Sequence, residues 1–224
     1  MNGKKVLAKE LAKKVTDGDC IGLGTGSTAE EIIRAIGERI KNEKLSITGV
    51  STSLVTTSVA SDMGIKVLPL SKALKVNWGF DGADEVSPDN CLIKGRGGAL
   101  LKEKIIANMI PEWIVGVTED KLVSKLGEKF LMPVEVVPTA TAIVENELLK
   151  LGCKEIVVRT GSNFYGPLFT ESGNLLFDVK FPEITESLMR EVKLLTGVVE
   201  HGFFPNTPNL KILLVDKDGK VSYR

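Results

Sequence analysis

Short apolar segments alternate with helical segments through the first half of the chain, and this alternation restricts the fold more than any other feature. Five runs have the length of buried strands, at residues 19–24, 47–51, 65–68, 76–80 and 113–117. Three segments between them are typical of helices, at residues 30–40, 54–63 and 98–109. Strand, helix and strand in repetition, joined by short links, predict a parallel sheet covered by helices.

The pattern changes after Pro133. Strand-like and helix-like segments now follow the order β-α-β-β-α-β, at residues 134–137, 139–151, 155–159, 175–180, 184–195 and 198–204. This order is typical of ferredoxin-like modules, and the apolar run at 210–215 is expected to return to the first sheet. We therefore predict an α/β fold, with a Rossmann-like parallel sheet and a smaller ferredoxin-like α+β domain inserted near the C-terminus. The large domain is expected at residues 1–131 and 208–224, and the small domain at residues 132–207.

Charge and residue usage exclude several classes of function. The chain has 29 basic and 29 acidic side chains, so neither nucleic acid nor a membrane surface is an expected partner. It has no apolar run of roughly 18 residues and no signal-peptide pattern. Three widely spaced cysteines, Cys20, Cys91 and Cys153, indicate a reducing compartment, so we expect a cytoplasmic protein. With His201 as the one histidine, a His-rich metal site is excluded and a Ser-His-Asp triad is disfavoured.

A glycine-rich segment, GLGTGSTAE at residues 22–30, joins the first predicted strand to the first predicted helix. Free backbone N–H groups and the helix dipole favour an anion at such a position, and Ser27 and Thr28 add hydroxyl donors. Ser27 with Glu30, or Thr28 with Glu31, also has capping-box spacing. The segment has neither the third glycine of the dinucleotide motif nor the lysine of a Walker loop. Taken alone, it fits phosphate binding and a tight turn with an ordinary cap equally well.

An acidic turn follows the strand predicted at residues 76–80. Asp81 and Asp84 flank Gly82 and Ala83, at the edge of the sheet where open α/β folds bind ligands. Two carboxylates there can bind sugar hydroxyls, transfer protons or hold Mg²⁺. The alternative is a solvated acidic turn, which the apolar residues directly before Asp81 disfavour.

A second glycine loop opens the helix predicted at residues 98–109. Lys94 precedes it, and Glu103 lies within the second turn of the helix. This position faces the same end of the sheet, so Glu103 is within reach of a substrate held there. The alternative is that Glu103 pairs with the neighbouring lysines on a solvated face. Lys121 also follows a strand at the expected ligand edge.

In series, these segments resemble ribose-5-phosphate isomerase of the A type, and the resemblance covers nearly the whole chain in order. It rests on GTGSTA at 24–29, DGADE at 81–85, KGRGGA at 94–99, EKI at 103–105, LG at 126–127, PVEVVP at 133–138 and GVV at 197–199. It implies interconversion of D-ribose 5-phosphate and D-ribulose 5-phosphate through an enediol, in the non-oxidative pentose phosphate pathway. It also implies no metal, no organic cofactor and a homodimer or homotetramer.

The resemblance further implies a role for each matching residue. Glu103 matches the catalytic base that moves a proton between C2 and C1, and Lys94 matches a group that stabilises the enediolate charge. Asp81 and Asp84 match residues that contact sugar hydroxyls and assist ring opening. The remaining positions implied to bind substrate are Lys4, Thr25, Gly26, Ser27, Thr28, Gly82, Ala83, Gly95, Arg96, Gly97 and Lys121.

The sequence departs from the family pattern at Arg96, where glycine is usual, and at Thr118 and Asp120. Arg96 would be strained if the loop needed a positive φ there. Two alternatives stay open at this point. An amino-sugar phosphate deaminase would want a further acid–base residue such as a histidine. A non-catalytic sugar-phosphate sensor would not need Glu103, and it would carry a DNA-binding element that the sequence lacks.

Overall fold

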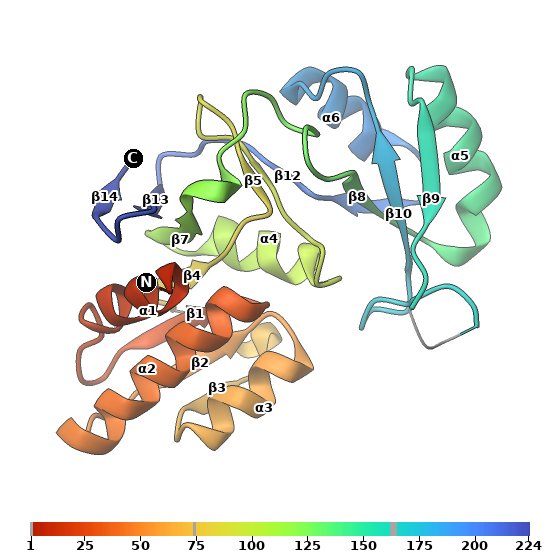
Figure 1. The fold of residues 1–224 in the computed structure, drawn as a ribbon. Coiled ribbons are helices and arrows are strands. Elements are labelled where there is room, and N and C mark those ends of the chain that lie inside the picture. Colours follow the sequence, from red (N-terminus) through yellow and green to blue (C-terminus); the bar gives the residue numbers. More distant parts are fainter. Residues whose placement is uncertain (1, 74, 162–164) are drawn as a thin grey trace. The chain divides into compact units, whose positions relative to one another are not determined.

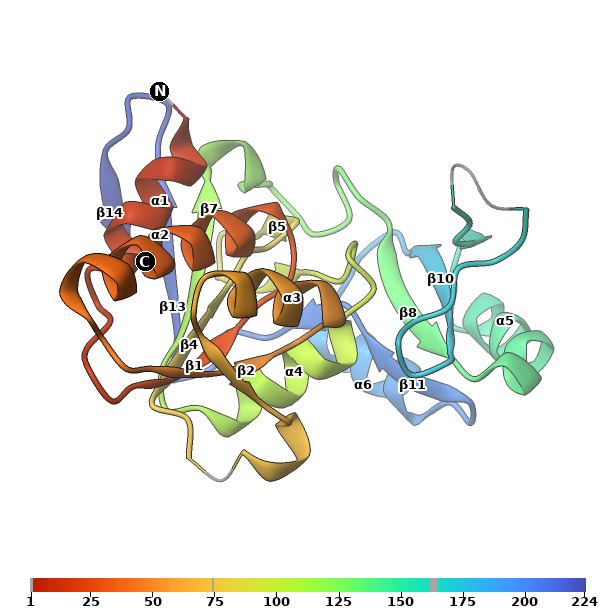
Figure 2. The same cartoon turned by 90° about the horizontal axis from the view of Figure 1, so that it is seen from below.

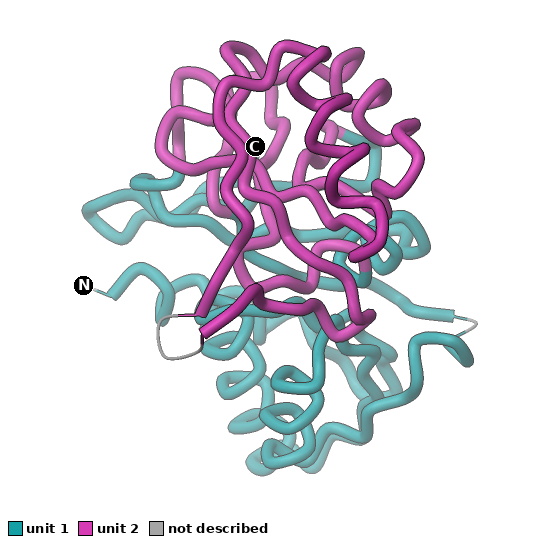
Figure 3. Tube along the Cα trace, turned by 90° about the vertical axis from the view of Figure 1, so that its right-hand side faces the viewer, with its two compact units in different colours: residues 1–83, 102–121, 207–224 teal, residues 84–101, 122–206 magenta. Residues whose placement is uncertain are grey.

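The computed structural model describes residues 2–73, 75–161 and 165–224, and the chain divides into two compact units (Figure 3). The first unit comprises residues 1–83, 102–121 and 207–224, and the second comprises 84–101 and 122–206. Residues 84–101 and 122–131 therefore lie in the second unit, whereas we expected them in the large domain. The reason is strand pairing, because short strands at residues 85–86 and 92–93 form a sheet with residues 203–204.

The first unit is built on a seven-stranded sheet (Figure 1). Its strands are β1 (Cys20–Leu23), β2 (Thr48–Ser51), β3 (Lys66–Leu68), β4 (Trp78–Asp81), β7 (Trp113–Thr118), β13 (Leu210–Val215) and β14 (Val221–Tyr223). Their order is β14-β13-β7-β4-β1-β2-β3, and every pair except β13 with β14 is parallel. The predicted parallel sheet and the return of residues 210–215 to it are confirmed.

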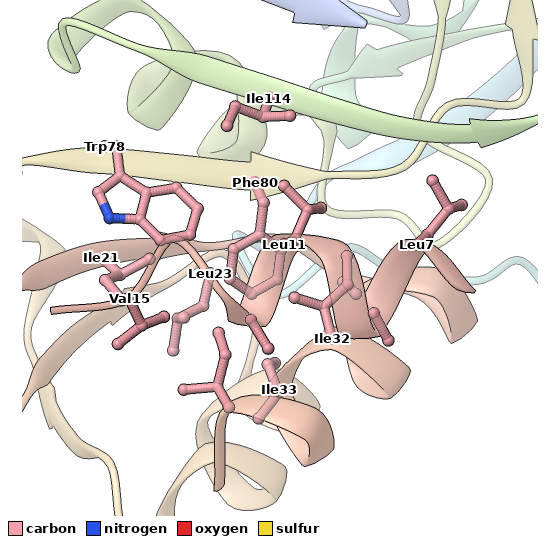
Figure 4. Packing of buried hydrophobic residues seen from close by; sticks show 14 of the residues in the cluster. Leu7, Leu11, Val15, Ile21, Leu23, Ile32, Ile33, Trp78, Phe80 and Ile114 are labelled. Atoms are coloured by element: carbon pink, nitrogen blue, oxygen red, sulfur yellow. The ribbon is translucent and has the colours of Figure 1, made fainter. Parts of the chain in front are cut away.

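Helices cover both faces of this sheet. Helices α1 (Gly3–Ala12), α2 (Ser27–Glu43) and α3 (Leu54–Asp62) lie on one face (Figures 1 and 2). Side chains alternate along a strand, so Ile21 and Leu23 of β1 point into the core beneath these helices (Figure 4). Helix α1 was not predicted; it begins after Asn2, whose side chain accepts a hydrogen bond from the backbone N–H of Lys4 at 3.1 Å. Two short 3₁₀ turns are η1 (Leu70–Lys72) and η2 (Glu119–Lys121).

Glycines allow a very close approach of α4 (Leu100–Met109) to the other face of the sheet. A Cβ atom on Gly22 of β1 would lie 2.7 Å from Cγ2 of Ile106. A Cβ atom on Gly79 of β4 would lie 2.8 Å from Cδ1 of Ile110 and 3.1 Å from the backbone of Gly22. The end of the helix is tied down as well, because the Asn209 side-chain amide donates to the carbonyls of residues 107 and 110 at 2.8 and 2.9 Å. The position of α4 is therefore fixed by contact with bare backbone.

The second unit contains the predicted ferredoxin-like module. Its elements are β8 (Met132–Val136), η3 (Pro138–Ala140), α5 (Thr141–Lys150), β9 (Glu155–Val158), β10 (Leu175–Lys180), α6 (Glu186–Leu194) and β11 (Val198–His201). The sheet order β11-β8-β10-β9 is antiparallel throughout, as the split βαβ arrangement requires. Val134 and Val136 of β8 pack in a core with Val144 of α5 and Met189 of α6.

A small sheet of β5 (Glu85–Val86), β6 (Leu92–Ile93) and β12 (Phe203–Phe204) completes the second unit. The strand predicted at 198–204 is broken at Gly202, where a Cβ atom would lie 2.3 Å from the carbonyl oxygen of Lys94. The backbone of Gly202 accepts a hydrogen bond from the N–H of Lys94 at 2.9 Å and donates one to the carbonyl of Pro133 at 2.7 Å. The break therefore joins the two sheets of this unit. Within the described ranges, no helix has the length and apolarity needed to cross a membrane.

We expect Gly79→Ala to lower the free energy of unfolding by about 1–3 kcal/mol, because its new methyl group must displace α4 or the neighbouring strand. Urea denaturation measures this change. Gly116→Ala is the matched control, since its Cβ in the same sheet would meet no atom closer than 3.6 Å, and its effect should stay under about 1 kcal/mol. Equal losses in the two variants would contradict this account of the packing.

Candidate functional site

The strand order of the first unit changes direction between β1 and β4. The chain runs outward from β1 to β2 and β3, and then returns to β4 on the other side of β1. The carboxyl edge of the sheet at such a point is where doubly wound sheets bind ligands. The loops at this point are residues 24–28 and residues 81–83. The structure thus places two of the three predicted motif segments at one location in the first unit.

The two loops touch at Gly24 and Asp81. The N–H of Gly24 donates to the carbonyl of Phe80 at 2.9 Å, and a Cβ atom on Gly24 would lie 2.3 Å from Oδ1 of Asp81. Asp81 is only 2% exposed, and its Oδ1 accepts a hydrogen bond from the N–H of Gly82 at 2.8 Å. A Cβ atom on Gly82 would lie 3.6 Å from Oγ1 of Thr28. The Asp81 carboxylate is therefore held rigidly beside the start of α2.

The N-terminus of α2 has no side-chain cap. The helix begins at Ser27, and its N-cap residue, Gly26, has φ +115° and no side chain with which to cap. Both capping boxes that we considered are therefore wrong, because Ser27 and Thr28 already lie inside the helix. In contrast, Asn2 and Ser53 cap α1 and α3 with their side chains. No cap side chain occupies the first N–H groups of α2, where a helix favours an anion.

One lysine side chain, that of Lys4, lies beside this helix end. Nζ of Lys4 donates to Oγ of Ser27 at 2.7 Å. Lys4 and Lys121 also line one cavity of about 710 Å³, together with Thr118 and Lys217. The cavity lies within the first unit, between the start of α1, η2 and the turn after β13. The structure thus places Lys4 at the start of α2 and, separately, Lys4 and Lys121 on one cavity.

Thr25, predicted to bind substrate, contacts several hydroxyl groups. Its Oγ1 lies 2.6 Å from Oγ1 of Thr52, 2.8 Å from Oγ of Ser53 and 3.1 Å from Oγ1 of Thr56. Oγ1 of Thr56 in turn donates to the carbonyl of Gly24 at 2.9 Å. The Thr25 hydroxyl is therefore engaged by the loop after β2 and holds the glycine-rich loop in place. Sequence reasoning missed this cluster, although the run of hydroxyl residues at 51–57 was a visible signal.

Glu103 lies in the first turn of α4 and is 3% exposed. The helix leads into β7 through residues 110–112, so it runs antiparallel to the strands and its first turn points toward their carboxyl edge. The alternative of a solvated glutamate on an exposed helix face is therefore wrong. A buried carboxylate at this edge is a candidate for proton transfer.

The remaining predicted residues belong to the second unit. Lys94 is 3% exposed, and its Nζ lies 5.6 Å from the centre of the Phe204 ring. Asp84 accepts a hydrogen bond from the N–H of Arg96 at 3.3 Å through Oδ2. In the following loop, Gly95 and Gly98 adopt positive φ values of 103° and 75°. Arg96 does not, so this departure from the family pattern carries no backbone strain.

Arg96 has a defined partner in the same unit. Its guanidinium group lies 4.3 Å from the centre of the Phe130 ring, a cation–π contact. The segment carrying Phe130 is fixed by the fully buried carboxylate of Glu85, which accepts from the N–H groups of Gly127, Lys129 and Phe130 at 2.6–2.7 Å. Glu85 is the last residue of the DGADE segment, and sequence reasoning assigned it no role. In the part of the chain that the structure describes, no group of three or more acidic, cysteine or histidine side chains is arranged to hold a metal ion.

Comparison with known proteins places the chain in a family. The sequence profile of ribose 5-phosphate isomerase A (phosphoriboisomerase A) matches residues 48–219. The ribose-5-phosphate isomerase A of Methanocaldococcus jannaschii is 43% identical over 96% of this chain and 95% of its own length. That of Pyrococcus abyssi is 44% identical over 94% of this chain and 93% of its own.

Solved structures of ribose-5-phosphate isomerases are also similar to this chain. The M. jannaschii enzyme has a TM-score of 0.93 at 41% identity, covering 100% of this chain and 98% of its own. A D-ribose-5-phosphate isomerase solved in complex with phospho-erythronic acid has a TM-score of 0.92 at 39% identity, covering 100% and 99%. By class, then, the chain is a sugar-phosphate isomerase with an α/β fold. It belongs to the ribose-5-phosphate isomerase A family, which decides against the deaminase and the sensor.

We expect Lys4→Gln to raise KM for ribose 5-phosphate roughly 10-fold, because a charged hydrogen bond to an anion contributes about 1.5–3 kcal/mol. The kcat value should change much less, since a contact between Lys4 and the phosphate would be the same in substrate and transition state. Steady-state kinetics measure both. Lys5→Gln, an exposed change one residue away, is the control. A KM equal to that of the Lys5 variant would rule out Lys4 as a phosphate ligand.

Proposed function

We propose that Glu103 is the base with which this ribose-5-phosphate isomerase interconverts D-ribose 5-phosphate and D-ribulose 5-phosphate. The carboxylate takes the proton from C2 of the open-chain aldose, and the electrons of that bond form the C1–C2 double bond of an enediol. The same proton is then delivered to C1. The proton of the C2 hydroxyl passes to the former aldehyde oxygen on C1, so C2 becomes the ketone carbonyl and C1 carries a hydroxyl group. The reaction is redox-neutral overall, and Glu103 returns to its starting state.

The observation that carries this proposal is the burial of Glu103 in the first turn of α4. A general base needs a fixed position within hydrogen-bond reach of the proton that it removes. The contacts of Ile106 and Ile110 with the glycines of β1 and β4 fix the helix. The direction of α4 brings its first turn to the edge where the loops after β1 and β4 lie.

The phosphate group is proposed to bind at the start of α2. Gly26, Ser27 and Thr28 present backbone N–H groups and hydroxyls there, and Nζ of Lys4 lies within hydrogen-bond distance of Ser27. A helix N-terminus with an adjacent cation suits a dianion. Lys121, on the same cavity as Lys4, is proposed to add a second positive charge. Thr25 belongs to the same proposed binding loop, and its hydroxyl contacts hold the loop in place.

The carboxylates of the DGADE segment are proposed to handle the sugar. Asp81, buried beside Gly24, would accept a hydrogen bond from a ring hydroxyl and assist ring opening, and Asp84 has the same predicted part. Gly82 and Ala83 present backbone groups between them. Lys94 is proposed to stabilise the negative charge that develops on the enediolate oxygen, and the loop of residues 95–97 to bind substrate beside it.

Phospho-erythronic acid, bound to one relative, supports the same chemistry. It carries a phosphate at one end and a planar, negatively charged carboxylate at the other. An enediolate is planar and negatively charged at the matching end, and ligands that imitate an intermediate bind tightly. We therefore propose that this chain also binds phospho-erythronic acid.

We propose that the protein is cytoplasmic and forms a homodimer or homotetramer. Cys20, Cys91 and Cys153 are all free thiols, which fits a reducing compartment, and burial raises the pKa of the Cys153 thiol above its ordinary value. Sedimentation equilibrium measures the number of subunits directly.

We expect Glu103→Gln to lower kcat by a factor of about 10²–10⁴, because an amide cannot accept the C2 proton. The coupled assay of ribulose 5-phosphate formation measures the rate. Calorimetric titration with phospho-erythronic acid shows whether the variant still binds a ligand. Glu145→Gln, the same change on the exposed face of α5, is the control and should leave kcat unchanged. Normal turnover by Glu103→Gln would rule out this base.

Incubation with EDTA, followed by gel filtration, should leave kcat unchanged, since the proposed proton transfer uses a carboxylate and a lysine rather than a metal. The coupled assay with metal-free reagents measures this. Loss of activity that Mg²⁺ restores would instead assign Asp81 and Asp84 to a metal ion.

A further inference from the structure

Arg159 and Asp178 form an ion pair in the second unit, outside the proposed active-site segments. Nε of Arg159 donates to Oδ2 of Asp178 at 2.8 Å, and its Nη2 contacts Oδ1. The two side chains are only 14% and 20% exposed. Arg159 directly follows the edge strand β9, and Asp178 lies on the neighbouring strand β10. Such a two-pronged pair fixes the plane of the guanidinium group as well as its position.

The third nitrogen of Arg159 points to the glycine loop that follows Lys94. Nη1 donates to the carbonyl oxygens of Gly95 and Arg96, both at 3.0 Å. One guanidinium group thus binds a carboxylate on one side and two successive backbone carbonyls on the other. Lysine cannot reproduce this arrangement, because its ammonium group lacks the planar fork.

The loop needs such a support. Gly95 and Gly98 have positive φ values, and glycine backbone is the most easily deformed. Within the loop, the N–H of Gly98 donates to the carbonyl of Gly95 at 3.1 Å. On its other side, the N–H of Lys94 is bound to the carbonyl of Gly202. Lys94 therefore lies between two anchors, one at Gly202 and the other at Arg159.

We infer that Arg159, oriented by Asp178, is a positioning residue for catalysis: it fixes the backbone of residues 95 and 96 and thereby the ammonium group of Lys94. This inference rests on the proposed role of Lys94 at the enediolate oxygen. A charge-stabilising group is effective only when its position is set before the reaction. The ferredoxin-like sheet then has a catalytic use, because the geometry of β9 and β10 determines where Lys94 is held.

The expected effect is on kcat rather than KM. Displacing a catalytic group by about 1 Å costs up to roughly 100-fold in rate, so Arg159→Lys should lower kcat about 10- to 100-fold. KM should rise by a smaller factor than kcat falls, because the proposed phosphate ligands Lys4 and Ser27 take no part in this network and only the substrate contacts proposed for residues 95–97 are disturbed. Asp178→Asn keeps the shape of the side chain and removes its charge, and it should lower kcat in the same direction by a smaller factor.

The decisive experiment is a double-mutant cycle with Lys94→Ala. If Arg159 acts through Lys94, Arg159→Lys lowers kcat of the parent enzyme but has almost no further effect in the Lys94→Ala background. Amide hydrogen exchange of residues 95–98 should also be faster in Arg159→Lys than in the parent.

Arg190→Lys is the matched control, the same change in the same unit at an exposed pair with Glu186, and it should leave kcat unchanged. Thr170→Val removes a hydrogen bond to the buried carboxylate of Glu135 and controls for general loss of stability in the second unit. If Arg159→Lys fails to fold, the cycle is run with Asp178→Asn.

The outcomes distinguish the positioning role of Arg159 from the catalytic role of Lys94. If Lys94→Ala lowers kcat but Arg159→Lys does not, the positioning inference is wrong and the proposed role of Lys94 survives. The inference is also wrong if the two losses multiply in the double variant, or if Thr170→Val gives the same loss at equal thermal stability. If Lys94→Ala turns over normally, the role proposed for Lys94 fails, and with it any action of Arg159 through that lysine.

Discussion

The close approach of α4 to the sheet is the constraint on which the first unit depends. Gly22 and Gly79 have no side chains to hold the helix away, and Ile106 and Ile110 fill the space that a Cβ would need. A helix seated on bare backbone cannot slide or rise without losing dense packing. The height of Glu103 above the edge of the sheet is therefore set by steric contact. Gly24 extends the same principle to the loop, because its missing side chain admits the carboxylate of Asp81.

Several polar groups in each unit hold loops in place. Thr25, Thr52, Ser53 and Thr56 hydrogen-bond to one another, while Glu85 binds three backbone N–H groups of one loop. Each of these groups is already partnered by protein, so each stiffens a loop. In the proposed mechanism, the start of α2 and Lys4 remain directed to the substrate. Rigid support of flexible glycine loops is what lets such loops approach an anion closely without collapsing onto it.

The sequence predicted the parallel sheet because buried strands read as continuous apolar runs, and the ferredoxin-like module because its element order is distinctive. It did not predict that residues 84–101 join the second unit, since β5 and β6 are two-residue strands whose partner, β12, is far away in the chain. Helix α1 was missed because its stripe of Leu7 and Leu11 is interrupted by lysines. The residue type of Thr25 could not show whether its hydroxyl faces a ligand or a neighbouring loop, because that depends on a tertiary contact.

The open start of α2 has a consequence for how recognition responds to acidity. Backbone N–H groups do not ionise in the physiological pH range. The N-terminus of α2 therefore has the same charge at pH 5 as at pH 8. A phosphate monoester, in contrast, gains its second negative charge near a pKa of about 6. Because the charge of the proposed phosphate site is constant, the protonation of the sugar phosphate itself is expected to set how strongly it binds. At such a site, the pH dependence of phosphate binding therefore comes from the substrate and not from the protein.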